Sequence, residues 1–245
     1  MTAPPAASTS KPASVFEDFV DIFYAPSQVF ERRRAGHFGL ALLILVVLTA
    51  IAFVAVKPAI QPAIDAQVDK AMEQLRSRPG ITAEQMTSIE AKSRKMSDVT
   101  SYVGPPIGVA VTVLLTGLGL WLVGKFFDAK QSYGQAAMVA TYANVPRVIG
   151  ILLGGVLAYF MSADQITSMY SVSLSAARFA GPGTSPVVVG LLSRIDPFTI
   201  WATILLAIGT RVTGGVSKKS AYTIAVILFL LGSVFAVIGA VRQGA

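Results

Sequence analysis

Arg147 is the charged residue with the clearest capacity for chemistry, because it is the only charge in the segment of residues 131–163. A charged side chain in the hydrocarbon of a bilayer is costly and commonly marks a functional site. Asn144 and Pro146 precede it, a spacing typical of a helix cap followed by a proline in the first helical turn. Asn144, Arg147 and Asp196 are therefore the candidate intramembrane or interfacial polar residues.

Two interpretations of the segment around Arg147 are open. In the first, a helix begins near Val145 and Arg147 extends toward the lipid headgroups, as arginines at the ends of spans commonly do. In the second, the helix begins at Gln135, is kinked at Pro146, and carries Arg147 near the middle of the membrane. Only the second interpretation makes Arg147 costly and gives it a function.

The other residue types that catalysis or metal binding requires are scarce. The chain has no Cys and a single His, His37, beside an arginine cluster. Thiolate or imidazole metal clusters and a Ser-His pair are therefore hard to build. The sequence also lacks a phosphate-binding Gly-Lys-Ser/Thr loop. We predict a protein that is not an enzyme, with no catalytic, metal-binding or cofactor-binding residue and no cofactor.

The elements that must position these residues are membrane helices. The chain is 53% hydrophobic and 13% charged, about half the charged fraction of roughly 25% that is usual in soluble domains. Three stretches are uncharged over a length that crosses about 30 Å of hydrocarbon as a helix, and none contains Asp or Glu. They are residues 38–56, 104–124 and 220–241.

Two further spans have less certain limits. One surrounds Arg147 at about residues 140–162. The other covers about residues 197–213, where Asp196 and Pro197 fit an N-cap and a first helical residue. The predicted fold is therefore all-α, a polytopic membrane bundle of about five transmembrane helices.

The charges outside the spans predict the orientation. Residues 1–14 are mostly Ala, Pro, Ser and Thr and are predicted to be a disordered tail, and residues 15–241 form the membrane domain. Lys and Arg near span ends remain cytoplasmic, which places the N-terminus inside and the C-terminus outside. The net charge of +7 is then explained by orientation and by attraction to anionic lipid, and no nucleic acid is needed. The residues that decide the orientation are Arg32, Arg33, Arg34, Lys125, Lys130, Arg211, Lys218 and Lys219.

Residues 57–103 form the longest polar region and are predicted to be an extracytoplasmic helical hairpin. Pro79 and Gly80 interrupt two helical patterns, and Thr82 with Gln85 fits a capping box that opens the second helix. The two apolar stripes pack on one another, dock on a partner protein, or do both. The stripes consist of Ile64, Val68, Ala71 and Leu75 in the first helix and Met86, Ile89, Met96 and Val99 in the second.

Small residues recur at helical spacing in two of the predicted spans. Gly150 and Gly154 form one such pair, and Gly232, Ala236 and Ala240 form a longer series in the last span. Such patterns allow helices to approach closely. They predict packing within the protein or contacts between copies in a homo-oligomer.

Three short stretches resemble the Yip1 family of five-span membrane proteins, over roughly residues 15–241. The segment before the first span is similar to the family's Asp-Leu-Tyr-Gly-Pro motif, and the segment after the second span is similar to part of its Tyr-Gly-Tyr motif. A third similar stretch, Asp-Pro-Phe-Thr-Ile-Trp, leads into the fourth span. The matching residues are Asp21, Tyr24 (or Phe23) and Pro26 in the first motif, and Tyr133 and Gly134 in the second.

This resemblance implies a non-enzymatic protein that acts through partners. Eukaryotic members are tied to small GTPases of the Rab type, and some bacterial members look like accessory subunits of exporters made of an ABC permease and a periplasmic adaptor. The short N-terminal tail and the long charged first loop favour a bacterial inner-membrane protein. The predicted partner-contact residues are Asp21, Tyr24, Pro26, Tyr133, Gly134, Ile64, Val68, Leu75, Met86 and Ile89.

Three functional hypotheses follow. The first is an accessory or scaffold subunit of a membrane protein complex, with the hairpin and the two motifs in contact with other integral membrane proteins. The second is a carrier or channel for a lipid or small solute, which requires Arg147 to line a cavity. The third is a trafficking factor that contacts a small GTPase through its N-terminal segment.

Overall fold

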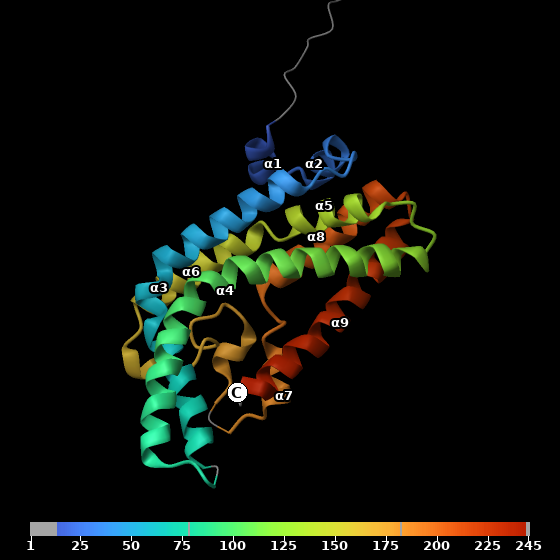
Figure 1. Cartoon of the computed structure of the whole chain (residues 1–245). Helices are drawn as coiled ribbons and strands as arrows, with labels where there is room; N and C mark the ends of the chain where they lie inside the picture. The colour runs from blue at the N-terminus through green and yellow to red at the C-terminus, as the bar shows by residue number, and fades with distance from the viewer. Residues whose placement is uncertain (1–13, 78, 182, 244–245) are drawn as a thin grey trace, which may run out of the picture.

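The computed structural model describes residues 14–77, 79–181 and 183–243, and within them every regular element is a helix (Figure 1). The prediction of an all-α membrane bundle is confirmed. The predicted disordered tail lies outside the described residues except for Ser14, which caps the first helix. The helices are α1 (Val15–Asp21), α2 (Pro26–Arg32), α3 (Gly39–Arg76), α4 (Ala83–Lys125), α5 (Tyr133–Ala143), α6 (Pro146–Tyr159), α7 (Pro186–Leu192), α8 (Pro197–Gly214) and α9 (Lys218–Gln243), with short 3-10 turns at Ala163–Gln165 and Ala176–Phe179.

Four segments of the described chain are long and apolar enough to cross a membrane: α3, α4, α5 with α6, and α9. The pair α7 and α8 makes a fifth span when counted as one, although its two helices are bent by 58°. The sequence predicted the α8 part of this pair but not α7. Helix α7 packs against α9 beside the C-terminal end of the chain (Figure 1).

Helices α3 and α4 run without interruption from the predicted spans into the predicted hairpin. They contain 38 and 43 residues, which correspond to roughly 57 Å and 65 Å of helix at 1.5 Å per residue. Prolines lie inside both helices, at Pro58 and Pro62 in α3 and at Pro105 and Pro106 in α4. Proline removes a helical hydrogen bond and bends the chain, and both arms change direction toward the tip of the hairpin (Figure 1).

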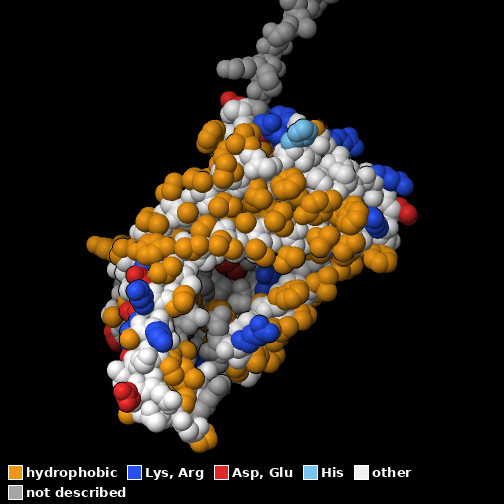
Figure 2. Space-filling view, viewed as in Figure 1, with side chains coloured by type: hydrophobic (Ala, Val, Ile, Leu, Met, Phe, Trp, Pro, Cys, Tyr) orange, Lys and Arg blue, Asp and Glu red, His pale blue; other side chains and the backbone are white. Residues whose placement is uncertain are grey.

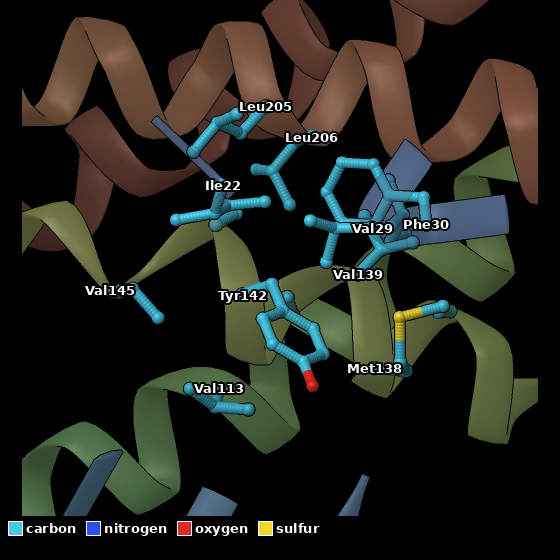
Figure 3. Packing of buried hydrophobic residues seen from close by; sticks show 14 of the residues in the cluster. Ile22, Val29, Phe30, Val113, Met138, Val139, Tyr142, Val145, Leu205 and Leu206 are labelled. Carbon is cyan, nitrogen blue, oxygen red and sulfur yellow. The ribbon is translucent and has the colours of Figure 1, made fainter. Parts of the chain in front are cut away.

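Helix α5 occupies the centre of the bundle. Its residues from Ala136 to Ala143 are all buried, because small side chains let the neighbouring helices approach closely. A Cβ at Gly117 of α4 would lie 2.8 Å from Ala137 Cα, and one at Gly209 of α8 would lie 2.4 Å from Val139 Cγ1. The N-terminal helices belong to the same core, since Ile22, Val29 and Phe30 are fully buried beside Val139, Tyr142, Leu205 and Leu206 (Figure 3).

The third span is broken between α5 and α6. Asn144 ends α5, and Pro146 occupies the first turn of α6. Proline has no N–H to continue the hydrogen-bond ladder, and the bonds next to it span three residues, from Arg147 N to the Asn144 carbonyl and from Val148 N to the Val145 carbonyl. The apolar segment that spans the break is Tyr133–Tyr159, so Arg147 lies near its middle.

Candidate functional site

The N-terminal motif is built around a buried carboxylate that the sequence did not single out. The side chain of Asp18 is fully buried and forms ion pairs with Arg32 Nη2 at 2.8 Å and with Arg33 Nε at 2.5 Å. The hydroxyl of Tyr142, in the middle of the bundle, donates to Asp18 Oδ2 at 3.3 Å. Asp18 therefore ties the α1–α2 corner to α5.

The motif residue Asp21 lies at the rim of this cluster. Its carboxylate pairs with Arg32 at 2.5 Å and is 30% exposed. The hydrogen bond to Asp21, with the nearby charges of both aspartates, raises the pKa of Arg32 above its usual value. Asp21 is thus paired with Arg32 within the chain and remains partly exposed.

The other motif residues divide into a structural and an exposed group. Pro26 is in the first turn of α2, where its missing N–H costs nothing. Tyr24 is 70% exposed on the turn between α1 and α2, so among the three residues of this motif it is the best placed to reach another molecule.

The second motif meets the chain that follows α2. A Cβ on Gly134 would lie 3.2 Å from the carbonyl oxygen of Gly36. The side-chain Nε2 of Gln135 donates to the backbone carbonyl of Arg34 at 2.8 Å. Tyr133 makes edge contacts with the rings of Phe38 and Trp121. The segments carrying the two predicted motifs are thus brought to the same end of the bundle.

Ion pairs join the two arms of the hairpin. Three pairs join α3 to α4: Lys57 with Asp98 at 2.5 Å, Asp69 with Arg94 at 2.8 Å, and Arg76 with Glu90 at 3.3 Å. Hydrogen bonds to Glu90 and Asp69 raise the pKa of Arg94.

The predicted apolar stripes pack only in part. Ile64 is buried against the end of α6 and the loop after it. Val68, Leu75, Met86 and Ile89 are half-buried, whereas Ala71 is exposed. Met96 and Val99 are 64% and 54% exposed, so packing of the two stripes on one another, as the first interpretation expected, does not extend to them.

The intramembrane candidates line two cavities that share Arg147. The larger, here called the arginine cavity, has a volume of about 600 Å³. It lies between α4, α8 and α9, and Asn144, Arg147 and Arg194 line it. Figure 2 shows the hollow on the face between α4 and α9, with basic and acidic atoms inside it. The smaller cavity, of about 260 Å³, is lined by Arg147 and Asp196 among others.

Asn144 does not act as the predicted cap of α6. Its Nδ2 donates back to the carbonyl of Ala140 at 2.7 Å, and the cap position of α6 is Val145, which makes no side-chain capping bond. The Oδ1 of Asn144 is buried without a hydrogen-bond partner among the described residues. The limits of α5 and α6 match the second interpretation of this segment, with a helix that starts before Asn144 and is broken at Pro146.

Asp196 acts as the predicted cap of α8. Its Oδ1 accepts a hydrogen bond from Thr199 N at 2.9 Å, and Pro197 follows as the first helical residue. Arg194, two residues earlier, was not predicted. It lies outside any clear sequence motif, and only the fold brings it beside Arg147.

The small-residue pairs pack within the protein. A Cβ on Gly150 would lie 2.9 Å from the ring of Phe198, and one on Gly154 would lie 2.9 Å from the carbonyl of Val172. Gly232 provides space for Arg194, whose Nη2 lies 3.1 Å from where a Cβ would be.

A family model described as the Yip1 domain matches residues 20–239. The chain belongs to the Yip1 domain family. Among curated proteins, membrane protein YknW of Bacillus subtilis (strain 168) is 27% identical over 156 residues, which cover 64% of this chain and 63% of that protein. No solved structure matches the chain. This match confirms the resemblance to the Yip1 family that the motif residues indicated.

Proposed function

We propose that this Yip1-family protein is a non-enzymatic accessory or scaffold subunit of a membrane protein complex, and that it contacts its partner through the hairpin of α3 and α4. The observation that carries the proposal is the exposed apolar face of α4. Met96, Val99 and Val103 are 64%, 54% and 47% exposed. Their spacing of three and four residues places them on one side of the helix.

The opposite side of α4 is already occupied. Glu90, Arg94 and Asp98 follow one another at intervals of four and pair with α3. Tyr102 continues this side, and Lys57 Nζ lies 3.6 Å from its ring centroid. The ion pairs orient α4 so that its apolar face points away from α3, which is the arrangement a docking surface requires.

The partner class rests on the family resemblance. An arm that extends well beyond the roughly 30 Å of hydrocarbon suits contact with an extracytoplasmic domain, and we infer that the partner is an ABC-type exporter with its periplasmic adaptor in the inner membrane of a bacterium. The motif end of the bundle, with exposed Tyr24, supplies a second contact surface at the cytoplasmic face.

Crosslinking and affinity purification from native membranes test this proposal. The variant Met96→Asp/Val99→Asp places two charges on the apolar face, and we expect it to lose a permease or adaptor that the unaltered protein retains. Gln67→Asp, on an exposed position of α3 outside the predicted apolar stripe, is the matched control and should retain the partner. A protein that purifies alone from crosslinked cells in all three forms contradicts the proposal.

A carrier for a lipid or small solute is the second candidate, and the position of Arg147 in the wall of two cavities favours it. Reconstituted protein should then move a fluorescent phospholipid between leaflets, and Arg147→Ala should abolish the movement. Equal rates in protein-free vesicles would exclude this activity.

A further inference from the structure

The arginine cavity holds more positive charge than the protein neutralises. Within the described residues, no hydrogen bond or ion pair is made to the side chain of Arg147 or Arg194, and the Nε of each is buried without a partner. Arg147 interacts electrostatically with both Arg194 and Asp196. Two positive groups with one negative group leave a single positive charge in a medium of low dielectric constant, where it is costly.

The cavity also offers a hydrogen-bond acceptor. Asn144 is 4% exposed, and its Oδ1 has no donor among the residues that the structure describes. An unmatched buried acceptor costs about 1–3 kcal/mol. A ligand that satisfies this site carries an anionic group for the arginines and a hydroxyl or ammonium hydrogen for Asn144.

The mouth of the cavity opens between two helices that are long and apolar enough to cross a membrane, α4 and α9. Its wall comes from residues 112–119 of α4 and 228–236 of α9, which lie inside uncharged spans. Leu115, Leu231 and Phe235 at the rim are 61%, 49% and 74% exposed. A water-soluble anion would have to cross acyl chains to enter, whereas a phospholipid can enter sideways and leave its tails in the membrane.

We propose that the arginine cavity binds the headgroup of a membrane phospholipid, with the phosphodiester on Arg147 and Arg194 and a headgroup hydroxyl or ammonium donating to Asn144 Oδ1. The single negative charge of a phosphodiester equals the charge that the cluster leaves uncompensated. Phe229 lies with its ring centroid 4.9 Å from the Arg194 guanidinium, and together with Gly232 it positions that group against α9. This site is independent of the hairpin contact proposed above.

Lipid retention measures this binding directly. The full-length protein is purified in a mild detergent, supplemented with dioleoyl phosphatidylglycerol, and examined by native mass spectrometry. We expect one tightly retained phospholipid per protein. Dioleoylglycerol, which has the same tails without the phosphate, should not replace it. Retention should fall about tenfold in Arg147→Gln and in Arg194→Gln, since each removes a charge-assisted contact.

Two further variants separate binding from folding. Arg211→Gln removes an exposed arginine of α8 outside the cavity and should retain the lipid. Thr112→Trp narrows the mouth of the cavity without altering either arginine and should lose it while remaining monodisperse. Lipid retention that is equal in all four variants overturns the proposal. Displacement of the lipid by millimolar inorganic phosphate overturns the lipid assignment, because it identifies a soluble phosphate as the ligand.

Discussion

Replacing Asp18 by Asn tests whether the N-terminal helices are part of the membrane fold. The substitution keeps the shape of the side chain and removes the charge that Arg32 and Arg33 contact. It also weakens the acceptor for the hydroxyl of Tyr142. The two arginines then lie beside a neutral amide and no longer have a carboxylate to pair with at this position.

The magnitude follows from burial. Breaking a fully buried ion pair costs about 3–5 kcal/mol. The arginine side chains here are 32% and 27% exposed, and this exposure screens part of the interaction. We therefore expect Asp18→Asn to lower the free energy of unfolding by about 2–3 kcal/mol.

Asp21→Asn is the matched control for this measurement. Asp21 pairs with the same Arg32 but is 30% exposed, so its loss should cost no more than about 1 kcal/mol. Thermal unfolding in detergent, followed by circular dichroism, should show a decrease in Tm of roughly 4–12 °C for Asp18→Asn. Equal decreases for the two variants would show that the buried cluster does not hold the N-terminal helices in place.

Three further changes probe the same end of the bundle, each measured by thermal unfolding in detergent. Gly36→Ala should destabilise the protein by about 1–3 kcal/mol, because Gly36 has a φ of +81° and a Cβ there would lie 2.8 Å from Gln135 N. Gly39→Ala is the control and should leave the stability unchanged, since a Cβ at Gly39 meets open space. An unchanged Tm for Gly36→Ala would contradict the close approach of the two segments. Gln131→Leu should cost about 1–2 kcal/mol, since its buried amide bonds both α4 and α8, and an unchanged Tm would argue against that link. Tyr24→Ala should stay within about 0.5 kcal/mol of the parent, and a larger loss would indicate a packing role for this exposed ring.

The sequence predicted those features that depend on neighbouring residues. Asp196 caps α8 by accepting a hydrogen bond from the N–H of Thr199, three residues later. Thr82 and Gln85 form the expected capping box of α4. Both are local arrangements, so residue type and spacing are sufficient to find them. The apolar spans were found for the same reason, because a membrane requires an unbroken run of apolar residues.

The features that the sequence did not predict depend on contacts between distant segments. Asp18 looks like an ordinary acidic residue of a first helical turn, and its burial comes from Tyr142 and from arginines 14 and 15 residues later in the chain. Arg194 belongs to no sequence motif, and only the turn between α7 and α8 brings it toward Arg147. Asn144 has the residue type of a cap, but its amide bonds the preceding turn instead.

The break in the third span and the charge in the cavity lie at the same place. Pro146 has no N–H to continue the hydrogen-bond ladder of α5, so a new helix starts in the middle of the apolar segment. The two helices are joined by backbone bonds from Arg147 N to the Asn144 carbonyl and from Val148 N to the Val145 carbonyl. Within the described residues, the side-chain Oδ1 of Asn144 beside this break has no donor. Broken helices are tolerated at membrane depth where they are buried in protein or line a cavity, and the cavity beside Pro146 meets this condition if a headgroup supplies the missing charge and hydrogen bond.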